Sequence, residues 1–161
     1  MGLVIDVVTK IIAVDRLDPT RPIRLLDGLL TLQLIRNPGA AFSSGARFTF
    51  VFAIAAVLVL LFVVIRLAPR IGHPGWAVAL GLLTAGVGGN LADQLFRQPG
   101  VLRGHVVDFL QLPHWPIFNV ADMCICGAAG SIIVLAVIKN VGIGGEHYTK
   151  ADPKTTHQSE T

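Results

Sequence analysis

Four aspartates lie in stretches of the sequence that are otherwise apolar, and they are the first candidates for chemistry: Asp6, Asp93, Asp108 and Asp122. An ionised side chain at the centre of a membrane helix costs about 2.5–3.5 kcal/mol on insertion scales, so carboxylates in such stretches are candidates for function. The chemistry that a carboxylate performs without a metal or cofactor is general acid–base catalysis. The sequence therefore predicts acid–base chemistry by aspartates.

Two of these aspartates are preceded by an asparagine at the same spacing. Asn90 and Asp93 are three residues apart and so share a helix face. Asn119 and Asp122 repeat that spacing. The two pairs can face each other across a helix bundle, either as a site or as polar contacts that hold membrane helices together.

Lys10 is the one lysine in an apolar stretch, and it follows Asp6 by four residues, the favourable order for a helical ion pair. This pair can be structural or part of a site. A Ser–Lys hydrolase would need a serine beside Lys10, and Ser43, Ser44 and Ser131 are the serines near membrane level. Nothing in the sequence pairs any of them with the lysine, so carboxylates are the better candidates.

The other residue types give little support for metal or nucleophile chemistry. The sequence has no glycine-rich phosphate loop, no HExxH and no G-x-S-x-G. His105 and His114 have no metal-ligand spacing. Cys124 and Cys126 point in different directions on a predicted helix, so they fit neither a disulfide nor a zinc site, and we expect them to be small core residues. We therefore expect neither a metal nor a cofactor.

Composition identifies the kind of protein that must position these side chains. Of 161 residues, 53% are hydrophobic and 14% are charged, whereas soluble domains carry about 25% charged residues. A mean hydropathy of +0.67 points the same way. A net charge of +3 from scattered basic residues gives no reason to expect nucleic-acid binding. The chain is predicted to be a small membrane protein that crosses the bilayer several times.

Four stretches are predicted as transmembrane helices: 1–14, 48–65, 76–96 and 119–138. The second is free of charge and about 27 Å long at ~1.5 Å per residue. The first is short for a span, at roughly 20 Å, and we expect its true start to lie upstream. The predicted fold is an all-α membrane protein of four transmembrane helices with a small β-rich segment outside the membrane.

Two loops, 15–47 and 97–118, fall on the same side of such a bundle. The first contains IRLLDGLLTLQLI, an apolar run expected to form a small sheet at the lipid surface, and then NPGAAFS, a turn into the second span. Residues 1–140 are predicted to form the membrane domain and 141–161 a polar, disordered tail. The counts of Lys and Arg on the two sides do not decide which side is cytoplasmic.

Five motifs in order resemble the lipoprotein signal peptidases (signal peptidase II): DVVTK from Asp6, RNPGAAFS from Arg36, GGNLADQ from Gly88, GHVVDF from Gly104 and FNVAD from Phe118. Each is short, but together they run through nearly all of the chain except the tail. The resemblance implies a bacterial inner-membrane aspartyl endopeptidase. Such an enzyme removes the signal peptide of diacylglyceryl-modified prolipoproteins just before the lipidated cysteine.

The resemblance also implies roles for particular residues. The catalytic pair would be Asp108 and Asp122, with Asp6, Lys10, Asn37, Asn90, Asp93 and Asn119 shaping or supporting the site. It implies globomycin as inhibitor, cytoplasmic termini and an active site at the outer membrane face. Independently of the resemblance, four packed helices need no partner chain, so we expect a monomer. Gln94 departs from the family, which usually has Arg there, and Arg97 one helical turn later could partly replace that charge.

Two rival interpretations remain from the residues alone. A small ion-coupled transporter could use Asp6, Asp93 and Asp122 as a relay, but transporters tend to show internal repeats and interrupted helices, which the sequence lacks. An aspartyl protease of the presenilin or prepilin-peptidase type would show G-x-G-D, and no aspartate here follows that pattern.

Overall fold

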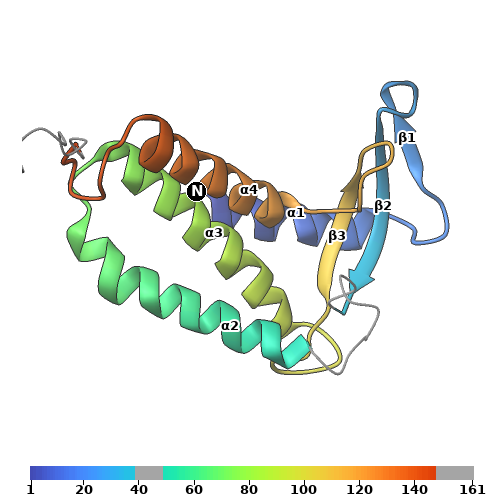
Figure 1. The fold of residues 1–161 in the computed structure, drawn as a ribbon. Coiled ribbons are helices and arrows are strands. Elements are labelled where there is room, and N and C mark those ends of the chain that lie inside the picture. The colour runs from blue at the N-terminus through green and yellow to red at the C-terminus, as the bar shows by residue number, and fades with distance from the viewer. Residues whose placement is uncertain (39–48, 148–161) are drawn as a thin grey trace, which may run out of the picture.

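The structure, a computed structural model, describes residues 1–38 and 49–147. Helices lie side by side, and a small sheet crosses one end of them (Figure 1). The elements in chain order are α1 (Gly2–Arg16), β1 (Ile23–Leu25), β2 (Leu30–Asn37), α2 (Thr49–Phe62), α3 (Pro74–Phe96), β3 (Val106–Gln111) and α4 (Val120–Ile133).

Among the described residues, three helices are long and apolar enough to cross a membrane: Thr49–Arg70, Pro74–Phe96 and Val120–Ile138. The first and last extend α2 and α4 through a wider π-type turn, at Val63–Leu67 and Val134–Ile138. The helix predicted for 48–65 thus continues to Arg70 in the structure. Long basic side chains extend toward the interface from a helix end and do not interrupt it.

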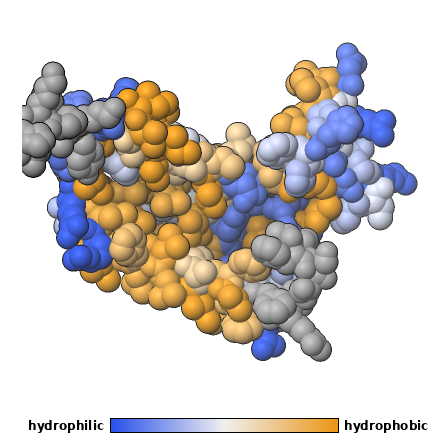
Figure 2. Space-filling view, in the orientation of Figure 1, coloured by the Kyte–Doolittle hydropathy of each residue, from blue (hydrophilic) through white to orange (hydrophobic). Residues whose placement is uncertain are grey.

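Helix α1 is a weaker candidate for the predicted fourth span. Its 15 residues reach about 22 Å at ~1.5 Å per residue, short of a ~30 Å hydrocarbon core. The helix nevertheless has its charged side chains inside and apolar ones outside, the reverse of a helix in a soluble protein. Asp6 and Lys10 are fully buried, whereas Val4, Ile11 and Ile12 are exposed. On the face drawn in Figure 2, apolar residues cover most of the helices, and one group of hydrophilic residues lies where the helices meet the sheet.

The sheet is antiparallel, in the order β1-β2-β3. The predicted sheet in 23–35 is confirmed as β1 and β2, but the third strand comes from the second loop, which was expected to be a loop only. Asp108 lies on this strand, opposite Ile35. The sheet is fixed to the helices by a core of Ala13 from α1 with Leu34, Val107 and Phe109.

Small residues let α3 approach its neighbours. A side chain at Gly86 would clash with the carbonyl oxygen of Ala121 in α4, and one at Gly89 with the carboxylate of Asp6 in α1. Gly86 and Gly89 thus bring three helix backbones together, as small residues do in other membrane bundles. That close approach is what lets polar side chains of α1, α3 and α4 reach one another.

The opposite end of the bundle holds the α2–α3 turn and the chain after α4 (Figure 1). There Val141 pairs with His147, and Trp76 donates its indole N–H to the Val141 carbonyl at 3.0 Å. The tail predicted from 141 thus begins with an ordered turn. The remainder of that tail, the NPGAAFS turn beyond Pro38, and Ser43 and Ser44 lie outside the described residues. Cys124 is buried as predicted, but Cys126 is exposed on the helix surface.

Candidate active site

A cleft of about 370 Å³ opens where the helices meet the sheet. One side is polar and contains both Asp108 and Asp122; the other side is apolar. The residues around it are Asn37, Phe52, Ala56, Val87, Asn90, Gln94, Val106, Asp108, Ile117, Asp122 and Ile125. The cleft therefore combines two carboxylates with a surface suited to an apolar chain.

Asp108 is held on β3 by amide side chains. Asn119 donates to its Oδ1 at 2.6 Å and Asn37, the last residue of β2, donates to its Oδ2 at 2.9 Å. The side chain is only 3% exposed. Burial raises the pKa of Asp108 to about 6, with the nearby charge of Asp122 adding to the rise, while the two amide hydrogen bonds partly oppose it. Asp108 therefore holds or releases a proton close to neutral pH.

Asp122 lies in the first turn of α4 and takes part in a capping box. Asn119 is the N-cap and its side chain accepts from the Asp122 amide at 3.0 Å, while Asp122 Oδ2 accepts from the Asn119 amide at 3.1 Å. Asn90 of α3 donates to Oδ1 at 2.9 Å. Asp122 is thus fixed by its own helix and by one neighbour, and it faces the same cleft as Asp108.

A second polar group lies deeper, between α1 and α3. The ammonium of Lys10 is 2.9 Å from Asp6 Oδ2 and 2.9 Å from Asp93 Oδ2. Asp6 also accepts from the Ala121 amide at 2.8 Å, which connects α1 to α4. The ion pair predicted between Asp6 and Lys10 is present, and its position makes it the point where three helices are joined.

Asn90 connects the two groups. Its Oδ1 accepts from Lys10 at 3.0 Å and from Asn119 at 3.2 Å, while its amide nitrogen donates to Asp122. The two Asn-x-x-Asp pairs predicted to face each other do so through these contacts. All eight residues selected from the sequence, Asp6, Lys10, Asn37, Asn90, Asp93, Asp108, Asn119 and Asp122, therefore belong to one hydrogen-bonded network.

Arg97 supplies the charge that Gln94 lacks. Its guanidinium Nε contacts Asp93 Oδ1 as donor and ion-pair partner. The backbone amide of Val107 donates to Asp93 Oδ2 at 3.1 Å, so Asp93 connects α3 to the sheet. Gln94 is buried and borders the cleft. The contact between Arg97 and Asp93 is the one through which Arg97 could partly replace the missing charge, whereas the place of Gln94 beside the carboxylates was not foreseen.

The apolar side of the cleft was also missed by sequence reasoning. Phe52 and Ala56 come from α2, Ile125 lies in α4, and Ile117 shortly precedes α4. In a membrane helix such residues do not stand out from those that face lipid, so the sequence holds no signal for them. Within residues 1–38 and 49–147 no cluster of His, Cys, Asp and Glu could hold a metal ion.

Comparison with known proteins gives consistent results. A family model described as signal peptidase (SPase) II matches residues 1–138. The chain is 45% identical to the lipoprotein signal peptidase of Rhodococcus jostii (strain RHA1) over 142 residues, which cover 88% of the chain and 69% of that protein. It is 44% identical to the lipoprotein signal peptidase of Mycobacterium avium (strain 104) over 135 residues, 84% of the chain and 74% of that protein.

Two solved structures share the fold. Both are bacterial membrane enzymes determined by the in meso method, one at 1.9 Å and one at 2.3 Å resolution. The first has a TM-score of 0.74 with 28% identity and covers 84% of this chain and 87% of its own. The second has a TM-score of 0.70 with 27% identity and covers 92% and 90%.

Proposed function

The chain belongs to the signal peptidase II family, and from that membership and the geometry of the cleft we propose that Asp108 and Asp122 form its catalytic pair. The family's activity is that of an aspartic peptidase that removes signal peptides from prolipoproteins. The observation that supports the assignment is that these two aspartates border one cleft and accept hydrogen bonds only from neutral amides in the described residues. The transporter alternative is set aside by this membership.

The reaction needs one proton shared between the two carboxyl groups. The ionised aspartate takes a proton from water, and the oxygen of that water attacks the scissile carbonyl carbon. The protonated aspartate donates a hydrogen bond to the carbonyl oxygen and then its proton, which gives a diol intermediate. As the C–N bond breaks, the first aspartate gives the proton it took from water to the leaving amine, and the second takes a proton back from a diol hydroxyl, which restores the shared proton. A raised pKa at Asp108 favours Asp108 as the initial proton donor and Asp122 as the base.

The remaining polar residues position this pair. Asn37 and Asn119 orient Asp108. Asn90 orients Asp122, and Asn90 is itself held by a hydrogen bond from Lys10. Asp6 and Asp93 hold Lys10 in place. None of these groups has to change its charge during the reaction, which is why amides and paired ions are suited to the role.

The apolar side of the cleft supports a lipid-modified substrate. We assign it to the region around the diacylglyceryl-modified cysteine, with cleavage just before that residue and with the acyl chains remaining in the membrane. Globomycin would compete by filling the same cleft. Phe52, Ala56 and Ile125 are the described side chains that such ligands would contact.

The arrangement in the membrane follows from the same reasoning. The sheet lies at one end of the helices, and the α2–α3 turn and the chain after α4 lie at the other (Figure 1). The cleft is at the sheet end, because Asn37 of β2 and Asp108 of β3 line it. We place the cleft at the outer face of the bacterial inner membrane and both termini in the cytoplasm, with α1 as the fourth membrane helix. A single chain contains the whole network, so we expect a monomer.

The test is cleavage of a diacylglyceryl-modified prolipoprotein by purified protein in detergent, followed by gel shift with and without globomycin. Asp108→Asn and Asp122→Asn should each lower the rate by about 10²–10⁴-fold, the usual contribution of general acid–base catalysis. Asp15→Asn is the matched control, because that aspartate is 70% exposed and outside the network. Near-normal cleavage by either cleft variant would remove that residue from the catalytic pair.

A further inference from the structure

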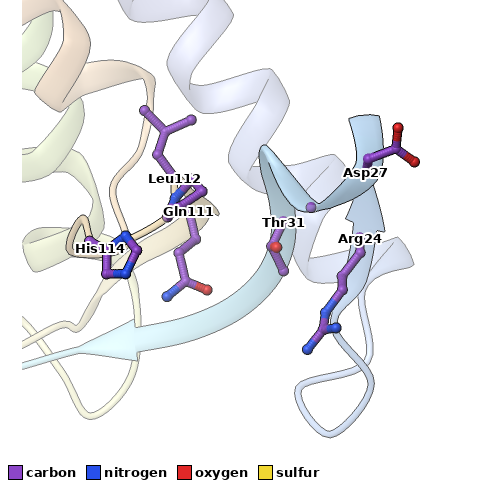
Figure 3. A pocket seen from close by; sticks show the side chains of 8 residues that line it. Arg24, Asp27, Thr31, Gln111, Leu112 and His114 are labelled. Carbon is purple, nitrogen blue, oxygen red and sulfur yellow. The ribbon is translucent and has the colours of Figure 1, made fainter.

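A second hollow lies at the far end of the sheet, away from the cleft, and the proposed reaction does not use it. Its volume is about 640 Å³. It lies between the β1–β2 turn and the connection from β3 to α4, with Arg24, Thr31, Gln111 and His114 among the residues around it (Figure 3). All four side chains can donate hydrogen bonds.

Strand register places three of these donors in a row. Arg24 is opposite Thr31, and Thr31 is opposite Gln111, so the row crosses all three strands on one face of the sheet. The three side chains point the same way in Figure 3. Pairing with backbone hydrogen bonds fixes the spacing of the row, so its donors are positioned before any ligand arrives.

The charge in this hollow is uncompensated. Among the described residues, no carboxylate forms an ion pair with Arg24. Asp27 borders the same hollow, but its carboxylate points away from Arg24 (Figure 3). The backbone of Asp27 is left-handed, with φ 53°, a conformation that costs a non-glycine residue energy and directs its side chain outward here. The hollow therefore presents donors and a positive charge, which favour an anion.

The position of the hollow indicates where that anion comes from. The β3–α4 connection leads directly into α4, one of the candidate membrane spans, so it lies at the end of a span. Leu26, Leu29 and Trp115 each come directly before or after a residue that lines the hollow, and all three are exposed. The hairpin end projects past the side of the helix bundle in Figure 1. A donor-lined hollow with an apolar rim at this level matches an amphiphile with an anionic head.

We propose that this hollow binds the phosphodiester of an anionic phospholipid headgroup at the membrane surface. Arg24 contacts the phosphate with its planar guanidinium, which suits two phosphate oxygens at once. Thr31, Gln111 and His114 complete the donor set, and the exposed leucines and Trp115 contact the start of the acyl chains. Binding would fasten the free end of the sheet to the membrane, some three residues along β3 from Asp108, or roughly 10 Å at ~3.4 Å per residue.

The test titrates the purified full chain in a neutral detergent with three probes: dihexanoylphosphatidylglycerol, inorganic phosphate and uncharged dihexanoylglycerol. The signal is Trp115 fluorescence in a Trp76→Phe background, with native mass spectrometry of the unaltered protein as a second readout that does not need that substitution. We expect saturable binding of the phosphatidylglycerol and none of the other two at equal concentration. Equal binding of inorganic phosphate would show a free-phosphate site, and equal binding of dihexanoylglycerol would show an apolar contact; either overturns the proposal.

Two arginine variants sharpen the result. Arg24→Gln should weaken phosphatidylglycerol binding by about tenfold or more, because it removes the charge-assisted contacts to phosphate. Arg21→Gln removes the same charge from an exposed side chain three residues earlier that does not border the hollow, and it should bind as the unaltered protein does. Equal affinities of the two variants would exclude Arg24 as the ligand and overturn the proposal.

Discussion

The two polar groups in this molecule contain the same kind of acid but treat it differently. In the deeper group, Asp6 and Asp93 share the ammonium of Lys10, and Asp93 also meets Arg97. In the cleft, Asp108 and Asp122 are contacted by amides and by no described cation. Ion pairing with Lys10 offsets the cost of burying the first two carboxylates, whereas no cation among the described residues contacts Asp108 in the cleft and burial raises the pKa of Asp108 to about 6.

This difference separates stability from chemistry. A buried carboxylate with a cation is costly to disturb, because removal of either partner leaves an uncompensated charge in a low-dielectric interior. A buried carboxylate without a cation already bears the cost of an uncompensated charge, and the raised pKa of Asp108 reflects that cost. Substitutions in the deeper group should therefore act on folding, and substitutions in the cleft should act on catalysis.

The largest effect on stability is expected for Lys10→Met. The change leaves Asp6 and Asp93 buried with one fewer cation between them and removes a donor from Asn90. We expect a loss of about 3–5 kcal/mol, the range for breaking a buried ion pair, seen as a large fall in Tm and in yield from detergent. Lys139→Met, the same change at an exposed lysine, should leave Tm unaltered; an equal fall in both variants would contradict the comparison.

The next effect contrasts one substitution in two places. Asp6→Asn removes one of the two carboxylates that neutralise Lys10. The free energy of unfolding should fall by about 1–3 kcal/mol, seen as a lower Tm. Asp108→Asn should leave Tm equal or higher at pH 7. The sign follows from the pKa of Asp108, which is 3.8 when unperturbed and about 6 in the folded chain. The folded state is favoured by protonation, so stability falls as pH rises from 3.8 through 6, and an asparagine avoids that loss.

A smaller effect is expected on the pH profile of cleavage. The hydrogen bond from Asn37 lowers the pKa of Asp108, so Asn37→Ala should raise that pKa above about 6, by up to about one unit for one lost hydrogen bond. Because the active form holds one proton between two carboxyl groups, kcat/KM should fall as pH rises through this pKa. In the variant, the pH at which kcat/KM falls should be higher. In both proteins the fall in kcat should come at a higher pH than the fall in kcat/KM, because bound substrate excludes water from the cleft. A fall in kcat/KM at the same or a lower pH in the variant would separate Asn37 from Asp108.

The smallest effect is expected for Arg97→Gln. Asp93 would keep Lys10 and the Val107 amide, and Arg97 is partly exposed, with 22% of its side chain accessible. We expect a loss of about 1 kcal/mol or less and a modest fall in Tm with little change in cleavage rate. If Arg97→Gln lowered Tm as much as Lys10→Met does, Lys10 would not be the principal cation of the deeper group.

Sequence reasoning was strongest where a pattern is local. The apolar stretches predict the helices within a few residues, and the five ordered motifs identify the family. The continuation of the second helix beyond residue 65 and the third strand in 97–118 were not predicted. The first depends on how a basic side chain reaches the interface, and the second on a pairing between β2 and β3 that only the folded sheet supplies.

Sequence alone selected the residues of the site but could not give them their environments. Asp108 and Asp122 are short-range neighbours in the chain, yet Asn37 approaches Asp108 from 71 residues away and Asn90 approaches Asp122 from 32. The Ala121 amide that contacts Asp6 is 115 residues distant. Residue types and spacing selected the carboxylates, amides and one lysine, and placed most of them on predicted helices. Which carboxylates meet the lysine, and which meet only amides, was decided by the close packing of α1, α3 and α4, because charge compensation depends on distance in space and not along the chain.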